Sequence, residues 1–428
     1  MTAVTSFDAA PPADPPPARP ANGVVFNGAE DVFWRLLSRG AVLLLVTLGV
    51  YRFWLQTDVR RFLWNNTEIA GEHLEYIGTA RELLLGFLVA IVFLAPLYAI
   101  FGLASLATEW VQQLAGLFSL VALAVLGQFA VYRARRYRLS RTVYRGIRFH
   151  QTGSAWRYAI CAIFWWGMIG MTLGLAYPWA QASLERFKIR NTWYGDLRGE
   201  FAGSGTRLFF RGVLLWFVAV APFVLSLVVA GAMFDGNLAG EATKQGTRGG
   251  ASALDAAGTG PAAAAAILGA LWLVVAIAVL YPAFQAMVLR WWISGLRFGE
   301  LSATSHLRTG TVYGLYWRFV WMALVLALVV GVVGFFAVKM VFSADASAGG
   351  PRLPYEVVEI SVVIGLYVVT ALAYSTIYQA TVKLPFWRHG FESVELKNVE
   401  VLDRVRAAPA TGSPVGEGFA DALHVGGI

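Results

Sequence analysis

The sequence predicts an all-α, polytopic helical membrane protein with about eight transmembrane helices in internal repeats, interfacial amphipathic helices and short polar hairpins. The first observation behind this prediction is composition: 57% of the 428 residues are hydrophobic and 14% are charged. Soluble domains carry about 25% charged residues. The second observation is that the stretch at residues 47–67 recurs in similar form at residues 172–192. Together they indicate a duplicated membrane protein.

The predicted spans are uncharged apolar runs of the length that a bilayer core requires, about 20 residues for about 30 Å. Arg39 and Arg52 lie near the two ends of the first run, which makes it the weakest of the set. The eight runs are Leu36–Trp54, Leu83–Leu106, Val111–Tyr132, Trp156–Trp179, Leu208–Phe234, Ala262–Tyr281, Phe319–Val338 and Ile360–Tyr378.

The repeat sets the predicted domain organisation. Residues 47–88 align without a gap on residues 172–213, and the matches cover a helix end, a polar loop and the start of the next helix. A second register, offset by 149 residues, pairs Gly146 with Gly295 and Phe149 with Phe298. The predicted boundaries are 1–24 for a disordered Pro/Ala-rich tail, 25–132 for membrane unit 1, 133–298 for membrane unit 2 with a Gly/Ala-rich loop at 235–261, 299–395 for a partial third unit, and 396–428 for a C-terminal tail.

Each unit has the same predicted local structure. An apolar helix ends at Thr-Leu-Gly, and residues 184–190 form a short amphipathic segment that suits a helix lying in the membrane plane. Asn191 and Thr192 stop that helix. The Gly-punctuated stretch WYGDLRGEFAGSG after Asn191 then predicts a turn or small hairpin before the next long helix.

The motifs TLG-x-x-YPW, RF-x-x-x-NT and F-x-x-TGSAWRY resemble those of the YjgN-like family of uncharacterised bacterial inner-membrane proteins, domain of unknown function 898. The resemblance spans most of residues 24–395, is most specific at 172–205 and 144–158, and is weakest in the last third. It implies a multi-pass protein of the bacterial inner membrane. It supplies no substrate and no catalytic residue.

The charges leave two topologies open. A unit of three spans requires the second copy to be inverted, as in many secondary transporters. However, eight spans divide the 34 basic residues almost evenly between the two sides, against the positive-inside rule. If Leu36–Trp54 and Trp156–Trp179 are instead re-entrant, only Lys244, Arg248, Lys339 and Arg352 lie on one side, and the other 30 (34 − 4) lie opposite. We expect eight spans, with six spans and two re-entrant segments as the alternative.

Candidate contacts for an anion, a lipid phosphate or a substrate are the polar residues that recur with the repeat and the nearby arginine cluster. Helix breaks that expose backbone are further candidates, although a glycine near a helix end is more often a cap. The candidate contacts are Arg61, Asn66, Thr67, Arg186, Asn191, Thr192, Arg141 and Arg148, and the candidate breaks are Gly49, Gly174 and Pro178. The alternative reading of the Asn-Thr pairs is a helix stop with an interfacial anchor.

Site chemistry is otherwise sparse. The histidines lack metal-ligand spacing, the single Cys161 excludes a cysteine cluster, and neither a G-x-S-x-G motif nor a Walker loop occurs. We therefore expect no enzyme, cofactor or metal. The net charge of +8 predicts contact with anionic phospholipid headgroups rather than nucleic acid. The leading hypothesis is a transporter or channel-like protein for a small solute or lipid, and the alternative is a non-transporting envelope scaffold that interacts with anionic lipid.

Overall fold

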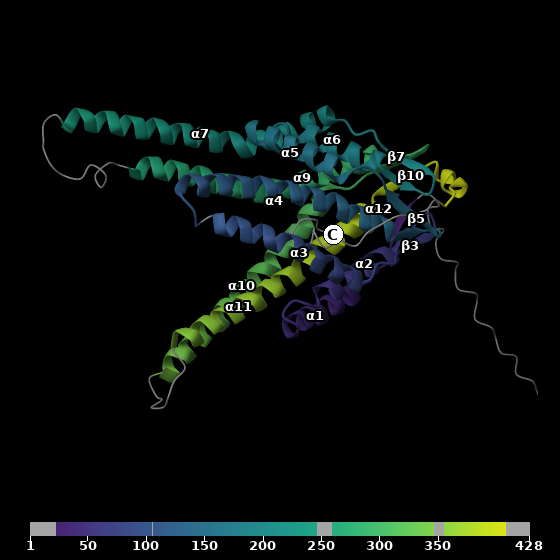
Figure 1. The fold of residues 1–428 in the computed structure, drawn as a ribbon, viewed down its shortest axis with the longest axis horizontal. Coiled ribbons are helices and arrows are strands. Elements are labelled where there is room, and N and C mark those ends of the chain that lie inside the picture. Colours follow the sequence, from purple (N-terminus) through teal and green to yellow (C-terminus); the bar gives the residue numbers. More distant parts are fainter. Residues whose placement is uncertain (1–22, 105, 246–258, 346–354, 408–428) are drawn as a thin grey trace, which may run out of the picture.

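The structure, a computed structural model, describes residues 23–104, 106–245, 259–345 and 355–407. Helical hairpins alternate with pairs of short strands along the chain, and the strands gather at one end of the molecule (Figure 1). Residues 1–22 of the predicted N-terminal tail, 246–258 of the predicted Gly/Ala-rich loop and 408–428 of the predicted C-terminal tail lie outside the described residues.

The strands form one antiparallel sheet in which sequence order and spatial order coincide. Its registers include Phe26 opposite Thr67 and Tyr144 opposite Ile147. A bridge between Gly23 and Glu395 joins the first strand to the last, so the ten strands close into a ring. The strands are β1 (Val24–Phe26), β2 (Thr67–Ile69), β3 (Glu72–Tyr76), β4 (Thr142–Tyr144), β5 (Ile147–Gln151), β6 (Thr192–Tyr194), β7 (Leu197–Phe201), β8 (Leu296–Phe298), β9 (Leu301–Ser305) and β10 (Val394–Lys397).

The helices connect neighbouring strand pairs and all leave the ring from the edge opposite to the tight strand turns. The last connection carries a π-helical turn, and a 3₁₀ helix follows the last strand. The helices are α1 (Glu30–Val46), α2 (Arg52–Asn65), α3 (Ala80–Ala104), α4 (Glu109–Ser140), α5 (Ala155–Met171), α6 (Tyr177–Arg190), α7 (Gly205–Gln245), α9 (Thr259–Gly295), α10 (Thr309–Asp345), α11 (Tyr355–Tyr378), η1 (Gln379–Lys383), α12 (Leu384–Glu392) and η2 (Val399–Arg404).

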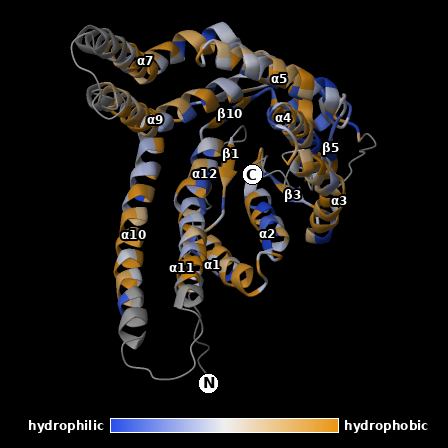
Figure 2. Cartoon of the chain, turned by 60° about the vertical axis from the view of Figure 1, so that its left-hand side comes forward, coloured by the Kyte–Doolittle hydropathy of each residue, from blue (hydrophilic) through white to orange (hydrophobic). Residues whose placement is uncertain are grey.

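The helices form a second ring above the strands. Each helix contacts the next along the chain, and α11 returns to contact α1. The long helices are apolar over most of their length (Figure 2), and many large apolar side chains on their outer faces are exposed, such as Phe118, Leu214 and Tyr367. Exposed apolar side chains on this scale mark a surface covered by lipid. A membrane-embedded helical ring therefore stands on a closed strand ring.

Six of the described helices are long and apolar enough to cross a membrane, so the expected eight spans are not confirmed. The six segments are Ala80–Ala104, Glu109–Ser140, Gly205–Met233, Ala262–Gly295, Thr309–Phe336 and Ile360–Glu392. The two predicted spans that are missing from this set correspond to α1 and α5, each of 17 residues. At 1.5 Å per residue, such a helix reaches about 25 Å, which is short of a bilayer core.

The α1–α2 and α5–α6 pairs turn back at the Thr-Leu-Gly motif. Leu48 and Gly49 have φ of 49° and 90°, and Leu173 and Gly174 have φ of 50° and 93°. Glycine adopts this left-handed region without steric cost, so the second residue of each turn suits it. The Thr172 hydroxyl donates to the carbonyl of Met168 (2.7 Å) and accepts from the backbone N–H of Ala176 (3.0 Å). This bridge satisfies backbone groups that lipid cannot solvate.

The structure does not confirm the inverted layout for the chain between β5 and β6. These strands are neighbours in one sheet, and the α5–α6 pair begins at β5 and ends at β6. The chain cannot cross the membrane an odd number of times and return to the same sheet. The six-span alternative with two re-entrant pairs agrees with the six candidate spans and with this pairing. The ten-stranded sheet also corrects the all-α class, although the hairpin predicted after Asn191 is confirmed as β6–β7.

Two finer predictions also change. The amphipathic segment 184–190 belongs to α6, and protein covers both sides of it: Leu184 packs with Tyr158 of α5, and Ile189 packs with Trp291 of α9. It is therefore part of the bundle rather than a helix in the membrane plane. The offset of 149 residues pairs Gly146, in the β4–β5 turn, with Gly295, the last residue of α9. That register does not align equivalent elements.

Candidate functional site

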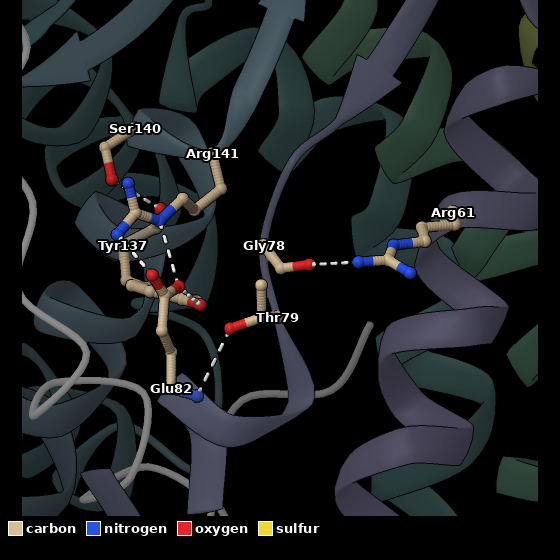
Figure 3. Close-up of polar contacts among 7 residues, drawn as sticks. All are labelled: Arg61, Gly78, Thr79, Glu82, Tyr137, Ser140 and Arg141. Carbon is tan, nitrogen blue, oxygen red and sulfur yellow. Dashed lines mark hydrogen bonds and ion pairs between the residues drawn. The ribbon is translucent and has the colours of Figure 1, made fainter. Parts of the chain in front are cut away.

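Arginines near the helix ends link each strand pair to the helical ring through a hydrogen bond, and each such bond is called an arginine clasp. In every case the guanidinium donates to the backbone carbonyl just beyond the second strand of the pair, and Figure 3 shows the first example, from Arg61 at 3.0 Å. The five donor and acceptor residues are Arg61 and Gly78, Arg136 and Gly153, Arg186 and Gly203, Arg290 and Leu307, and Arg388 and Gly28. The fifth clasp joins the C-terminal part of the chain to its N-terminal strand.

The predicted pair Arg61 and Arg186 is thus not brought together around one anion. Each side chain serves its own strand pair, at 3.0 Å and 3.5 Å. The predicted Asn66 and Asn191 each donate from the side-chain amide to a backbone carbonyl four residues earlier, both at 2.7 Å. A side chain that satisfies the last carbonyls of a helix acts as a C-terminal cap. Both asparagines therefore lie as the alternative interpretation, a helix stop, expects.

The two predicted threonines complete these stops. Thr67 donates to the carbonyl of Leu63 (2.7 Å), and Thr192 donates to the carbonyl of Lys188 (2.9 Å). The Thr67 hydroxyl also accepts from the indole of Trp387 (3.0 Å). Gly49 and Gly174 form the breaks described above, and Pro178 lies in the first turn of α6. That position suits proline, because an N–H there has no partner within the helix.

The remaining predicted arginines differ from each other. Arg141 holds Glu82 through two nitrogens, at 2.8 and 3.1 Å, and Tyr137 donates to the same carboxylate at 2.6 Å (Figure 3). Partial burial opposes the charge of Arg141, but Glu82 outweighs this and raises its pKa. The cluster joins α3 to α4. Arg148 lies exposed on β5, where it is available to solvent or a lipid surface.

The site that the sequence did not indicate is a cavity of ≈ 820 Å³ lined by residues of both rings, here called the chamber. Its walls are mainly apolar and aromatic. Tyr144 and Tyr194 line it from the strands, and Trp64, Trp292 and Trp387 line it from the helices. The volume lies within the range of about 300–1,000 Å³ that is typical of ligand sites, as does the apolar lining with a few polar groups.

The polar groups of the chamber are neutral or cationic. Gln285, Tyr316, Tyr378 and Gln379 line it toward the membrane, and the phenol of Tyr316 donates to the Gln285 carbonyl oxygen at 2.8 Å. Nearer the strands, burial raises the pKa of Tyr194 to about 12, so this phenol stays neutral at physiological pH. The charged lining residues are Arg135, Arg138 and Lys383. The described lining contains no aspartate and no glutamate.

Lys383 reaches the chamber from the π-helical turn η1. Pro385 lies in the first turn of α12 and has no N–H for the carbonyl four residues earlier, that of Thr381. A π-helical turn contains one residue more than an α-helical turn, and η1 ends at Lys383, two residues before this proline. The ammonium of Lys383 lies 6.0 Å from the ring centroid of Tyr378, and no ion pair of Lys383 with a described carboxylate occurs. Such π turns are frequent at functional sites.

The 3₁₀ helix η2 closes the strand end of the chamber. Leu402 is buried among Leu74, Tyr144 and Tyr194, from three different strands. Polar contacts then tie this segment, here called the plug (residues 398–406), to three strand turns. Arg145 pairs with Asp403, the side chain of Asp196 accepts from the backbone N–H of Arg406 (3.0 Å), and Asn398 donates to the carbonyl of Glu300 (3.1 Å). The predicted tail at 396–428 thus begins with an ordered closure.

Sequence reasoning missed the chamber because its lining residues are scattered over the whole chain. One local signal existed for Lys383, a lysine with no acidic residue within eight positions and followed after one residue by proline. Among the residues that the structure describes, no three His, Cys, Asp or Glu side chains come together as a metal site would require.

The chain is similar to a bacterial protein family and, over part of its length, to an inner-membrane protein. Residues 21–422 match a family described as bacterial protein of unknown function (DUF898). Inner membrane protein YjgN of Escherichia coli O157:H7 is 27% identical over 130 residues, which cover 30% of this chain and 31% of that relative. No solved structure matches. With six helices able to span a bilayer, the chain is a multi-pass inner-membrane protein.

Proposed function

We propose that this chain, which belongs to the DUF898 family of bacterial proteins of unknown function, is a transporter or channel-like protein that takes a small solute or a single-chain lipid into the chamber. The observation that carries the proposal is the cavity of ≈ 820 Å³ in the centre of the helical ring. Two closed rings could pack their side chains solidly against each other, and protein interiors normally contain few voids larger than a water molecule. A large cavity with polar groups at one level therefore supports a ligand site.

The proposal includes an orientation. The side that carries the strand ring is cytoplasmic, because the six-span sequence topology assigns it 30 (34 − 4) of the basic residues. Among the described basic residues, Lys244 and Lys339 lie toward the far ends of α7 and α10. The plug then closes the cytoplasmic end of the chamber. Leu402 of the plug covers the strand end of the chamber, so passage to the cytoplasm by this route requires the plug to move.

The proposal also includes the internal repeat. Residues 47–88 and 172–213 have the same succession of elements, namely a helix end, a Thr-Leu-Gly turn, a second helix, two strands and the start of a long helix. The five arginine clasps place the same donor at the same point of five units. These likenesses support descent from a single helical hairpin with its strand pair.

Transport is tested with proteoliposomes that contain a trace of fluorescent NBD-labelled lysophosphatidylglycerol, a single-chain anionic lipid. Dithionite added outside destroys only the label it can reach, about half in vesicles without protein. We expect wild-type protein to make most of the label accessible. Leu289→Trp, which fills the chamber from α9, should slow this transfer at least tenfold. The matched control is Leu271→Trp, because Leu271 lies on the same helix but faces outward and is 56% exposed.

If wild-type vesicles behave as vesicles without protein, transport of this lipid class is excluded. The alternative, a non-transporting scaffold that contacts anionic lipid, is favoured by one observation: Arg148, Arg198 and Arg297 lie exposed on the strands. It predicts that purified wild-type protein retains phosphatidylglycerol and that replacement of these three arginines by glutamine removes it. Equal retention by the triple variant would contradict the scaffold reading.

A further inference from the structure

We infer that the chamber selects an amphipathic anion, a molecule with one apolar chain and one carboxylate or phosphate group, and that Lys383 binds the anionic group. This inference rests on the proposed function and names its ligand class. It starts from the charge of the lining: three cationic side chains, no described acidic one, and otherwise apolar or aromatic walls. A cationic or strongly polar neutral ligand has no complementary partner in such a cavity.

The three cations are not equivalent. Arg135 lies close enough to Glu185 of α6 for the two charges to interact. Glu185 is itself buried, pairs with Lys188, and accepts from the indole of Trp292 at 3.0 Å. Arg135 thus already has a carboxylate in its surroundings. Arg138 lies on the same helix, half-buried, and also makes contacts within the protein. These two arginines fix the positive potential at the strand end of the chamber.

Lys383 has a different environment. Its contact with a described residue is the ring of Tyr378, 6.0 Å from the ammonium, and its side chain lines the chamber. Lys383 is half-buried, and a charge partly withdrawn from water without a counter-ion is costly, because desolvation is not offset by an ion pair. Proteins usually avoid this arrangement unless a ligand supplies the opposite charge. An anion bound at Lys383 would provide that charge.

Neighbouring groups complete a head-group site. Gln285 and Tyr316 line the same chamber as Lys383 and are joined by the 2.8 Å hydrogen bond. Tyr316 also interacts with Tyr378, the ring beside the Lys383 ammonium. The amide nitrogen of Gln285 donates to the phenol of Tyr281 at 2.8 Å, which fixes the orientation of the amide. Rigid polar groups around one cation favour a small anionic group of defined position. The apolar chain would then lie against Trp387, Leu289 and Phe391, which are among the lining residues.

The source of such a ligand is the membrane. Fatty acids and lysophospholipids both combine one acyl chain with one anionic group, and the structure distinguishes neither from the other at Lys383. The two share the chemistry that the site requires. A carboxylate probe and a phosphate probe with the same chain separate them in the experiment.

The test uses chain-matched photoreactive probes, each with a diazirine in the chain and a terminal alkyne: a fatty acid, a lysophosphatidic acid and a fatty alcohol. Full-length protein in nanodiscs is irradiated, digested, and analysed for labelled peptides. We expect both anionic probes, or one of them, to label peptides of α9, α12 and the strands at least tenfold more than the alcohol, because a hydrogen bond to a charged group contributes that much or more to binding.

Variants assign the preference to one side chain. Lys383→Met should reduce anionic labelling to the level of the alcohol, and Lys383→Arg should keep it. The matched control is Lys339→Met, since Lys339 lies exposed far along α10 and also stands over an aromatic ring, that of Phe335 at 5.1 Å. This control should label as the wild type does. Normal labelling by the alcohol in Lys383→Met shows that the variant is folded.

The outcomes separate this inference from the proposed function. If all three probes label the chamber equally and Lys383→Met changes nothing, selection of an anion is overturned while ligand entry stands. If no probe labels the chamber in the wild type, the proposed function fails with it. If anionic labelling is strong but is lost in Lys339→Met as well, the preference belongs to the surface charge and the assignment to Lys383 is wrong.

Discussion

The strand ring and the helical ring follow the same order along the chain, yet they differ in how uniform they are. Every strand pair is short, antiparallel and clasped by an arginine at the same point. The helical hairpins are unequal, because three are long enough to span a bilayer and two turn back early at Thr-Leu-Gly. The comparison suggests that the strands and their arginine clasps form a uniform structural support, here called the frame. The variation in helix length then determines the shape of the chamber.

The largest expected effect concerns the two short hairpins. On a Cys161→Ser background, single cysteines at Arg148 and Glu200, which flank the α5–α6 pair, should react with a membrane-impermeant thiol reagent from the same face, because both lie exposed on one sheet. A cysteine at Thr108, between α3 and α4, should react only from the opposite face. Each cysteine should be labelled either in intact cells or in inverted vesicles, but not in both.

Labelling of Arg148→Cys and Glu200→Cys from opposite faces would restore eight spans and remove the common frame. Labelling of Thr108→Cys from the strand side would show instead that α3 and α4 do not span. Either outcome would contradict the division into three membrane-spanning and two re-entrant helix pairs.

The next effect tests whether the clasps are structural. Arg388 closes the ring: it donates to the carbonyl of Gly28 (2.5 Å), pairs with Glu30 (3.2 Å) and stands over the ring of Phe26. Arg388→Ala removes the guanidinium from that carbonyl and leaves the Glu30 carboxylate with Arg318 alone, at 3.5 Å, so we expect a loss of about 2 kcal/mol in the free energy of unfolding. Thermal unfolding in detergent, followed by tryptophan fluorescence, measures this as a lower midpoint.

The control is Arg148→Ala, because Arg148 is exposed on β5 and surface substitutions usually change stability by about 0.5 kcal/mol or less. Equal losses from the two variants would mean that the clasp contributes no more than surface charge. A normal unfolding midpoint for Arg388→Ala combined with altered lipid transfer would show that the arginine clasps serve transport rather than stability.

A smaller effect is expected at the re-entrant turn. Thr172→Val keeps the shape of the side chain but removes the hydroxyl that joins the Met168 carbonyl to the Ala176 N–H. The Met168 carbonyl keeps the backbone N–H of Thr172 (3.0 Å), but the Ala176 N–H loses its partner, which in a lipid surrounding should cost about 1–3 kcal/mol. The matched control is Thr370→Val, whose hydroxyl donates only to the Leu366 carbonyl inside the continuous helix α11, so its loss should be minor. Similar midpoints for both variants would contradict the role given to Thr172.

The membrane class and the local stops could be predicted because they depend on neighbouring residues. The Thr-Leu-Gly turn, the Asn191 cap and the β6–β7 hairpin each lie within a few positions of the residues that cause them. The number of spans was decided by a balance between run length and charge. The positive-inside rule favours six spans, in agreement with the six helices that are long and apolar enough. The length of Trp156–Trp179 favours an extra span, but the turn at Leu173 and Gly174 divides this run into two helices.

The strand ring and the chamber could not be predicted in the same way. Strands of three to five residues carry too little periodicity to be recognised, and the pairing of β3 with β4 joins residues separated by two long helices. Closure depends on Gly23 meeting Glu395 from opposite ends of the chain. Lys383 becomes a site residue only once the helices that surround it are arranged in a ring.

The smallest expected effect is a pH dependence within the frame itself. The imidazole of His150 on β5 stacks on Trp193 of β6, with ring centroids 6.1 Å apart and planes within 6°. Burial lowers its pKa below the ordinary value of 6.5. As pH falls through 6.5, His150 is therefore protonated in the unfolded chain but stays neutral in the folded protein. The contribution of His150 to the free energy of unfolding is thus complete above this pH and declines below it.

His150→Phe keeps the stacking and removes the titration, so the decline in the unfolding midpoint between pH 7 and pH 5 should be shallower than in the wild type. The difference should be small, because the ring is only partly buried. An identical slope in both proteins would show that the β5–β6 contact opens to solvent before the helices unfold. In that case the strand ring would be the less stable of the two rings, and the helices rather than the strands would provide the frame.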